Sequence, residues 1–142
     1  MVRLVIHDTA GDDLCALAER DKDGAARIAV FLQELAGDQD ALDKLTVDHY
    51  EDTEINVCQI YSLQRRGLNL WRVKLAAIED ELQWSPYRII YAFDTARRWI
   101  WILGIGKKGR GGFSYDQSDP IIRRVLETYD RLGLNRIPYA GD

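Results

Sequence analysis

The residues best suited to chemistry in this chain are cations that recur at regular spacing. Residues 69–76 read NLWRVKLA, an alternation of apolar and basic side chains that predicts a β-strand with one apolar and one basic face. Arg72 and Lys74 share the basic face, about 7 Å apart along the strand. That spacing suits two adjacent phosphates. The alternative is an ordinary solvent-facing strand, but the strongly apolar opposite face favours the phosphate interpretation.

A third cation, Arg88, stands inside the apolar segment YRIIYAFD, residues 87–94. Arginine is rarely placed among so many apolar residues without a partner. A structural ion pair with Asp94 or with the acidic segment 77–86 is one explanation. A bound anion is the other.

Further cations and aromatic residues lie near these strands in the sequence. Lys107, Lys108 and Arg110 occupy a glycine-rich segment, GKKGRGG, which is either a binding loop or simply a flexible charged loop. Of the four tryptophans, three belong to apolar patterns typical of a core. Trp84, which precedes Pro86, is expected to be exposed and available to stack on a nucleic-acid base.

Histidines and cysteines give no sign of a catalytic or metal centre. His7 and His49 lie apart and lack paired partners, which indicates structural or surface roles. Cys15 and Cys58 sit in apolar patterns without CxxC spacing, so we expect buried thiols rather than a disulfide or a metal site. No metal and no other cofactor is expected.

The elements that must position these residues follow from periodicity and from turn residues. A β-strand is expected at 2–8, helices at 12–20 and 22–36, and one or two helical turns at 38–46. Strands are expected at 55–63, 69–76, 87–94 and 98–105, and a last helix from Pro120, capped by Asp119, to about Gly133. The prediction is a two-layer α+β domain: N-terminal strand, helical hairpin, antiparallel β-meander and C-terminal helix.

Length and charge distribution add to this description. The 142 residues are expected to form a single domain, 1–142, with no transmembrane helix and no signal peptide, which indicates a cytoplasmic protein. The net charge is −4, but residues 1–56 carry 14 acidic and 5 basic residues, whereas residues 57–142 carry 14 basic and 9 acidic residues. Such an asymmetry can mark a polyanion site on one face, although ordinary solvated surface charge is an equal alternative.

Three motifs in this second half resemble the RelE/ParE toxin superfamily, and most closely its RelE and HigB-like branch. They are LWRVKL (70–75), YRIIYAFD (87–94) and WIWILGIGKK (99–108), in the family's order and near its spacing. The resemblance covers about residues 68–108. The segment 38–66 makes the chain longer than usual for the family, and GRGGFSYDQSD replaces the usual continuation after the lysine pair.

The resemblance implies a toxin of a type II toxin–antitoxin system: a metal-independent endoribonuclease that cleaves ribosome-bound mRNA, inhibits translation and arrests growth. In that family the RNA 2′-hydroxyl attacks the neighbouring phosphate. The implied catalytic residues are Lys74 as base or charge stabiliser, Arg88 on the scissile phosphate, Lys108 at the position of a catalytic arginine, and Tyr115 for proton transfer or base stacking. The implied RNA-binding residues are Arg72, Lys107, Arg110 and Trp84.

Two alternatives share the fold. The chain could inhibit DNA gyrase, as ParE relatives do without nuclease activity, or it could be a repurposed domain that acts through protein contacts, which the overall acidity favours. Under the toxin hypothesis the partners are mRNA, the ribosome and a cognate antitoxin, without any membrane. We expect Arg72, Lys74, Arg88 and Lys108 to converge on one concave face of the sheet. An acidic, amphipathic antitoxin segment would cover it and would also pack near Ile121, Ile122 and Val125.

Overall fold

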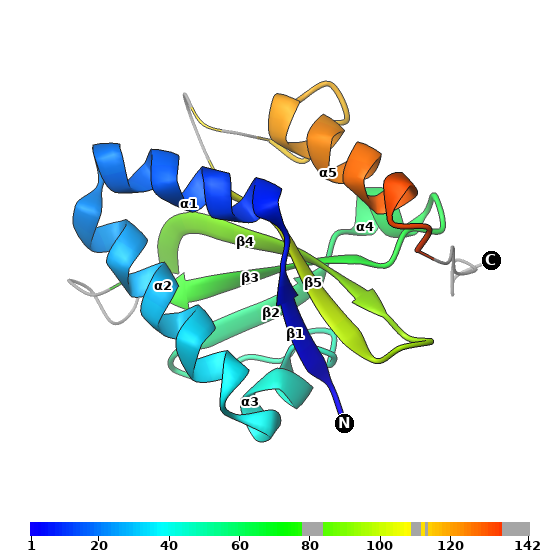
Figure 1. Ribbon diagram of the computed structural model, residues 1–142, viewed down its shortest axis with the longest axis horizontal. Helices are drawn as coiled ribbons and strands as arrows, with labels where there is room; N and C mark the ends of the chain where they lie inside the picture. Colours follow the sequence, from blue (N-terminus) through cyan, green and yellow to red (C-terminus); the bar gives the residue numbers. More distant parts are fainter. Residues whose placement is uncertain (78–83, 109–111, 113, 135–142) are drawn as a thin grey trace.

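The protein is built on a mixed five-stranded sheet, seen in a computed structural model that describes residues 1–77, 84–108, 112 and 114–134 (Figure 1). The strands lie in the order β1-β5-β4-β3-β2. β1 runs parallel to β5, and every other neighbouring pair is antiparallel. The strand bounds are β1 Arg3–Ile6, β2 Ile55–Gln59, β3 Leu70–Ala76, β4 Trp84–Asp94 and β5 Trp99–Lys107. The expected α+β class and the meander from β2 to β5 are confirmed.

In the part of the chain that the structure describes, five helices accompany the sheet: α1 Asp8–Arg20, α2 Lys22–Ala36, α3 Gln39–Lys44, α4 Tyr61–Gln64 and α5 Pro120–Arg131. Side chains cap the starts of all of these helices except α4. Asp21 Oδ1 accepts the Gly24 N–H at 2.9 Å, which ends α1 and begins α2. Asp119 Oδ1 accepts the Ile121 N–H at 2.8 Å, and Pro120 occupies the first turn of α5, as the sequence predicts.

Helices cover both faces of the sheet, so the expected two-layer arrangement is wrong. One core, on the inner face, joins the α1–α2 hairpin to alternate residues of the strands, among them Val73, Ile89 and Ile102. A second core, on the outer face, joins α4 and α5 to the intervening residues, among them Leu70 and Ile90. Ile122 and Val125 are fully buried in this second core. They are therefore not available to a partner, contrary to expectation, whereas Ile121 stays half-buried.

Several element boundaries differ from the sequence expectation. α1 begins at Asp8, where the strand 2–8 was expected to continue, because His7 caps the helix and its Nδ1 accepts the Thr9 N–H at 3.2 Å. The strand expected over 55–63 ends at Gln59, and residues 61–64 turn into α4, which places Leu63 in the second core. β4 begins at Trp84 and continues through Pro86, where a loop was expected. The ladder is irregular there, between the Lys74–Arg88 and Ala76–Trp84 pairs, and an irregular ladder is where a strand tolerates proline.

α1 and α5 are tied together through the last strand. The Asp13 carboxylate accepts the Ile105 N–H at 2.9 Å and also binds the Arg124 guanidinium, with Arg124 Nη1 at 2.8 Å. Gly104 lets α5 approach β5 closely, because a Cβ there would stand 3.1 Å from the Val125 side chain. These contacts fix α5 over one end of the outer face and leave the other end for the basic residues.

Candidate functional site

The sheet register brings the strand cations together on the outer face. Lys74 of β3 is the direct cross-strand partner of Arg88 of β4, and Arg72 is the partner of Ile90. Side chains directly opposite each other lie on the same face, with Cβ atoms about 4.5–5.5 Å apart. The expectation that Arg72, Lys74 and Arg88 share one face is confirmed.

Lys108 joins this group from the end of β5. Its backbone N–H donates to the Pro86 carbonyl at 2.9 Å, and its Nζ lies 5.3 Å from the centre of the Tyr115 ring. Its charge is one of those that lower the pKa of Lys74, so it acts on the same region of the face. We call Arg72, Lys74, Arg88 and Lys108 the cationic face.

Arg88 is held by its own strand. Its Nη1 donates to the Ser85 carbonyl at 2.7 Å and to the Tyr87 carbonyl at 3.1 Å. Burial lowers the pKa of Arg88, yet a guanidinium stays charged in proteins. Its Nε is buried and has no hydrogen-bond partner among the residues that the structure describes. A buried donor without a partner is energetically costly.

Tyr115 lies against Arg88 and Lys108. Burial raises the pKa of its phenol, while hydrogen bonding to Arg88 and the Arg88 charge act in the opposite direction. The result is a tyrosine that keeps its proton above the usual range. A protonated phenol beside two cations can donate a proton to an oxygen that develops negative charge.

Lys74 has the opposite character. The pKa of its amine is lowered, first by burial and then by the charges of Arg72, Arg88 and Lys108. A lowered pKa makes the neutral amine, which can accept a proton, more accessible near neutral pH. The pair therefore offers a proton acceptor and a proton donor on one face, with cations between them.

Two residues expected at the site, Lys107 and Trp84, are placed differently, and a third is not described. Lys107 pairs with Tyr87 on the inner face and its charge acts on Asp21, so it lies on the other side of the sheet. There it lines a cavity of about 540 Å³ between α1 and the start of α5. Trp84 is half-buried as the first residue of β4, not exposed in a loop. Arg110 lies outside the described residues.

A bulge explains which lysine reaches the cationic face. The register of β4 and β5 shifts between the Ile90–Gly104 and Tyr91–Ile102 pairs, which leaves Leu103 as an extra residue on β5. Uninterrupted alternation from Ile100, an inner-face residue, would put Lys107 on the outer face. The extra residue reverses this, so Lys107 points to the inner face and Lys108 to the outer face.

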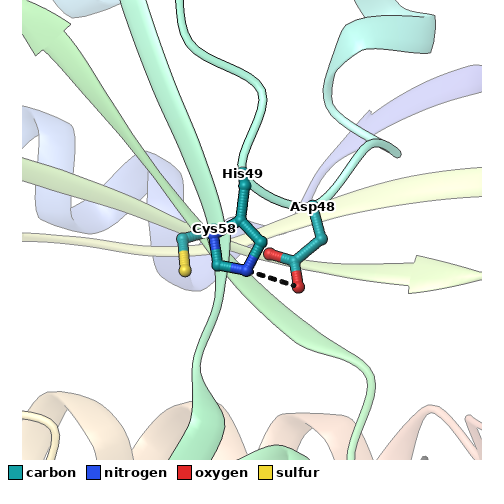
Figure 2. Close-up of side chains that lie close together, drawn as sticks. All are labelled: Asp48, His49 and Cys58. Carbon is teal, nitrogen blue, oxygen red and sulfur yellow. Dashed lines mark ion pairs between the residues drawn. The ribbon is translucent and has the colours of Figure 1, made fainter.

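A second group of reactive side chains borders the cationic face. Asp48 and His49 precede β2, Cys58 lies on β2, and Figure 2 shows the three close together. Cys58 is the cross-strand partner of Arg72. The Tyr61 hydroxyl lies 2.5 Å from His49 Nε2, and Asp48 Oδ2 lies 3.5 Å from the same nitrogen.

This group corrects the sequence interpretation of histidines and cysteines. His49 is not isolated, because Asp48 and Tyr61 are its partners. The thiols are not both buried: Cys15 is exposed, and Cys58 is half-buried on the outer side of β2. Alternation in INVCQ predicts that Cys58 lies on the strand face opposite to that of Ile55 and Val57. No local signal in the sequence indicates that residues 48–49 fold back onto Cys58.

Comparisons of the chain with protein-family models, with curated proteins and with solved structures found no match. The RelE/ParE resemblance therefore rests on the motifs named above. Within the described residues, no helix combines the length and apolar character needed to cross a membrane.

Replacement of Lys74 by methionine should stabilise the protein. The change keeps the apolar stem and removes a charge directly opposite Arg88, and a like-charge pair across a ladder is destabilising by about 0.2–1 kcal/mol. Urea unfolding at pH 7 and low salt should show a higher free energy of unfolding, and the gain should shrink as salt screens the repulsion. Lys22→Met, at an exposed position of α2, is the matched control and should change little. Equal or lower stability of Lys74→Met would show that the two cations do not repel.

Proposed function

We propose that this protein is a RelE/ParE-type toxin of a type II toxin–antitoxin pair that cleaves mRNA with the side chains of its cationic face. The observation that carries the proposal is the direct opposition of Lys74 and Arg88, with Lys108 and Tyr115 beside them. Concentrated positive charge suits the phosphates of RNA. The lowered pKa of Lys74 and the raised pKa of Tyr115 suit acid–base chemistry on a phosphodiester.

The reaction follows from these properties. Neutral Lys74 takes the proton of the RNA 2′-hydroxyl, and the 2′-oxygen attacks the adjacent phosphorus. Arg88 and Lys108 hold the charge that builds on the phosphate oxygens. The bond from phosphorus to the 5′-oxygen breaks, and Tyr115 protonates that oxygen. The products are a 2′,3′-cyclic phosphate and a 5′-hydroxyl, and no group beyond these side chains is needed to balance the step.

Arg72 has a supporting role in this proposal. Its Nη1 donates to the Asn56 carbonyl at 3.0 Å and to the Asn56 side-chain oxygen at 2.6 Å, so the guanidinium is fixed over β2. From there it can bind the phosphate next to the scissile one. Single-stranded message held on the ribosome is the RNA that such an open face can reach, and the antitoxin would be an acidic segment that competes for the same cations.

Arg88→Ala and Lys74→Ala should each abolish growth arrest and RNA cleavage. Loss of the Arg88 donor to a transition-state oxyanion lowers the rate by about 10²–10³-fold, and loss of the Lys74 general base lowers it by about 10²–10⁴-fold. The measurement is mapping of mRNA 5′ ends after induction in bacterial cells, together with cleavage of ribosome-bound message by the purified protein. Lys107→Ala, which removes an equal charge from the inner face, is the control and should keep full activity.

The outcomes separate the alternatives. Growth arrest without RNA cleavage, relieved in cells whose gyrase is resistant, would support a ParE-like inhibitor instead. Harmless expression in bacteria, with neither effect, would favour a repurposed binding domain. If Lys107→Ala lowered activity as much as Arg88→Ala, the cationic face would not be the catalytic site.

The pH dependence of cleavage should report the protonation state of the Lys74 amine. The groups that face its amine are Arg72, Arg88 and Lys108, which lower its pKa together with burial, and Cys58, which acts in the opposite direction. Because the neutral amine is the active form, kcat/KM should rise with pH through this lowered pKa and then level off. Tyr115 keeps its proton over that range because its own pKa is raised.

Arg72→Gln provides the diagnostic variant for this profile. It removes one of the charges that lower the Lys74 pKa, so the rise of kcat/KM should move to higher pH, whatever the variant does to KM. A rise that stays at the wild-type pH in Arg72→Gln, or that persists in Lys74→Ala, would rule out Lys74 as the base.

A further inference from the structure

The side chains of Asp48, His49 and Cys58 form a compact group with mixed donor atoms. One ligand atom from each residue, a carboxylate oxygen, an imidazole nitrogen and a thiol sulfur, can be chosen so that all lie within 4.8 Å of one another. Figure 2 shows the imidazole of His49 beside the Asp48 carboxylate, with the Cys58 sulfur close by. The mechanism proposed above uses none of the three.

The fold holds these ligands in place before anything binds. Asp48 Oδ1 accepts the backbone N–H of Gln59 at 2.9 Å, which fixes the carboxylate beside the edge strand β2. His49 adopts φ 66°, in the left-handed region that few residues other than glycine occupy. With this backbone conformation, the imidazole ring of His49 lies between Asp48 and Tyr61.

The site is accessible and has a supporting layer. The side chain of His49 is 67% exposed and that of Asp48 is 27% exposed, so an ion has a path from solvent. The Gln59 N–H on Asp48 is the kind of outer contact that orients metal ligands. The Tyr61 hydroxyl, 2.5 Å from His49 Nε2, is a further polar group at the edge of the site.

The donor set selects one class of metal. Sulfur, imidazole nitrogen and one carboxylate oxygen are ligands that zinc accepts together, whereas Mg²⁺ and Ca²⁺ require mainly oxygen. Bonds of about 2.0–2.3 Å in tetrahedral geometry separate ligand atoms by about 3.5 Å. Ligand atoms already within 4.8 Å therefore need only small side-chain rotations to close on one ion.

We propose that Asp48, His49 and Cys58 bind one divalent ion of the zinc class, with a fourth coordination position open to solvent or to a ligand. The ion would fasten the connection between α3 and β2 to the edge of the sheet. It would also place a positive charge beside Arg72, the cross-strand partner of Cys58. The proposal does not depend on the ribonuclease hypothesis, because the binding site and the cationic face have no residue in common.

The test is a titration of the purified protein with Co²⁺, a spectroscopic substitute for Zn²⁺. The buffer contains a phosphine reductant, which keeps the thiols reduced. We expect one Co²⁺ per chain, a thiolate-to-cobalt charge-transfer band and visible bands typical of tetrahedral coordination. Added Zn²⁺ should bleach these bands at one equivalent. Cys58→Ser should lose the charge-transfer band and at least tenfold in affinity.

Cys15→Ser is the matched control, because it removes the other thiol, which is exposed on α1. Cys15→Ser should bind Co²⁺ like the wild type. Zn²⁺ should raise the melting temperatures of the wild type and of Cys15→Ser, but not that of Cys58→Ser. His49→Gln, at an exposed side chain, is a second variant that should also weaken binding if Cys58→Ser fails to fold. Binding without a thiolate band, binding unchanged in Cys58→Ser or in a folded His49→Gln, or no stoichiometric binding would each overturn the proposal.

Discussion

The direct opposition of Lys74 and Arg88 across the β3–β4 ladder is the constraint on which the site depends. Like charges in this arrangement repel, and burial adds to the penalty for Lys74. The register cannot slip by one residue to relieve the repulsion, because a slip would carry Val73 and Ile89 out of the inner core, where both are buried. Hydrophobic packing on one face thus enforces a charge concentration on the other.

The outer face is divided along the strands. At one end, Leu70 and Ala92 are paired and buried beneath α5 and its neighbours. At the other end, Lys74 and Arg88 remain half-buried, with Tyr115 packed against the edge of the same apolar cluster. Partial burial of this kind shifts the pKa values of Lys74 and Tyr115 in opposite directions.

Much of this arrangement can be predicted from the sequence, where the signal is local. Alternation in NLWRVKLA places Arg72 and Lys74 on one face, and Asp119 with Pro120 marks the start of α5. Other features depend on contacts between distant segments. The extra residue at Leu103 exchanges the facing of Lys107 and Lys108. Gly104, inside the apolar run WIWILGI, is compatible with a bulge, but the sequence does not fix where the ladder shifts. The approach of Asp48 and His49 to Cys58 depends on how the connection before β2 folds back, which periodicity does not describe.

The most direct test of the central claim is the salt dependence of RNA binding, measured with a single-stranded RNA whose 2′-hydroxyls are replaced by fluorine to prevent cleavage. Each phosphate neutralised on a single strand contributes about −0.7 to the slope of log K against log salt. At a pH below the Lys74 pKa, where Lys74 carries its charge, the four residues of the cationic face therefore predict a slope of up to about −2.8. Replacement of Lys74 and Arg88 by methionine together should reduce it to about −1.4, whereas Lys107→Met should leave it unchanged. A slope that the double replacement does not alter, or that falls with Lys107→Met, would contradict the assignment of RNA binding to this face.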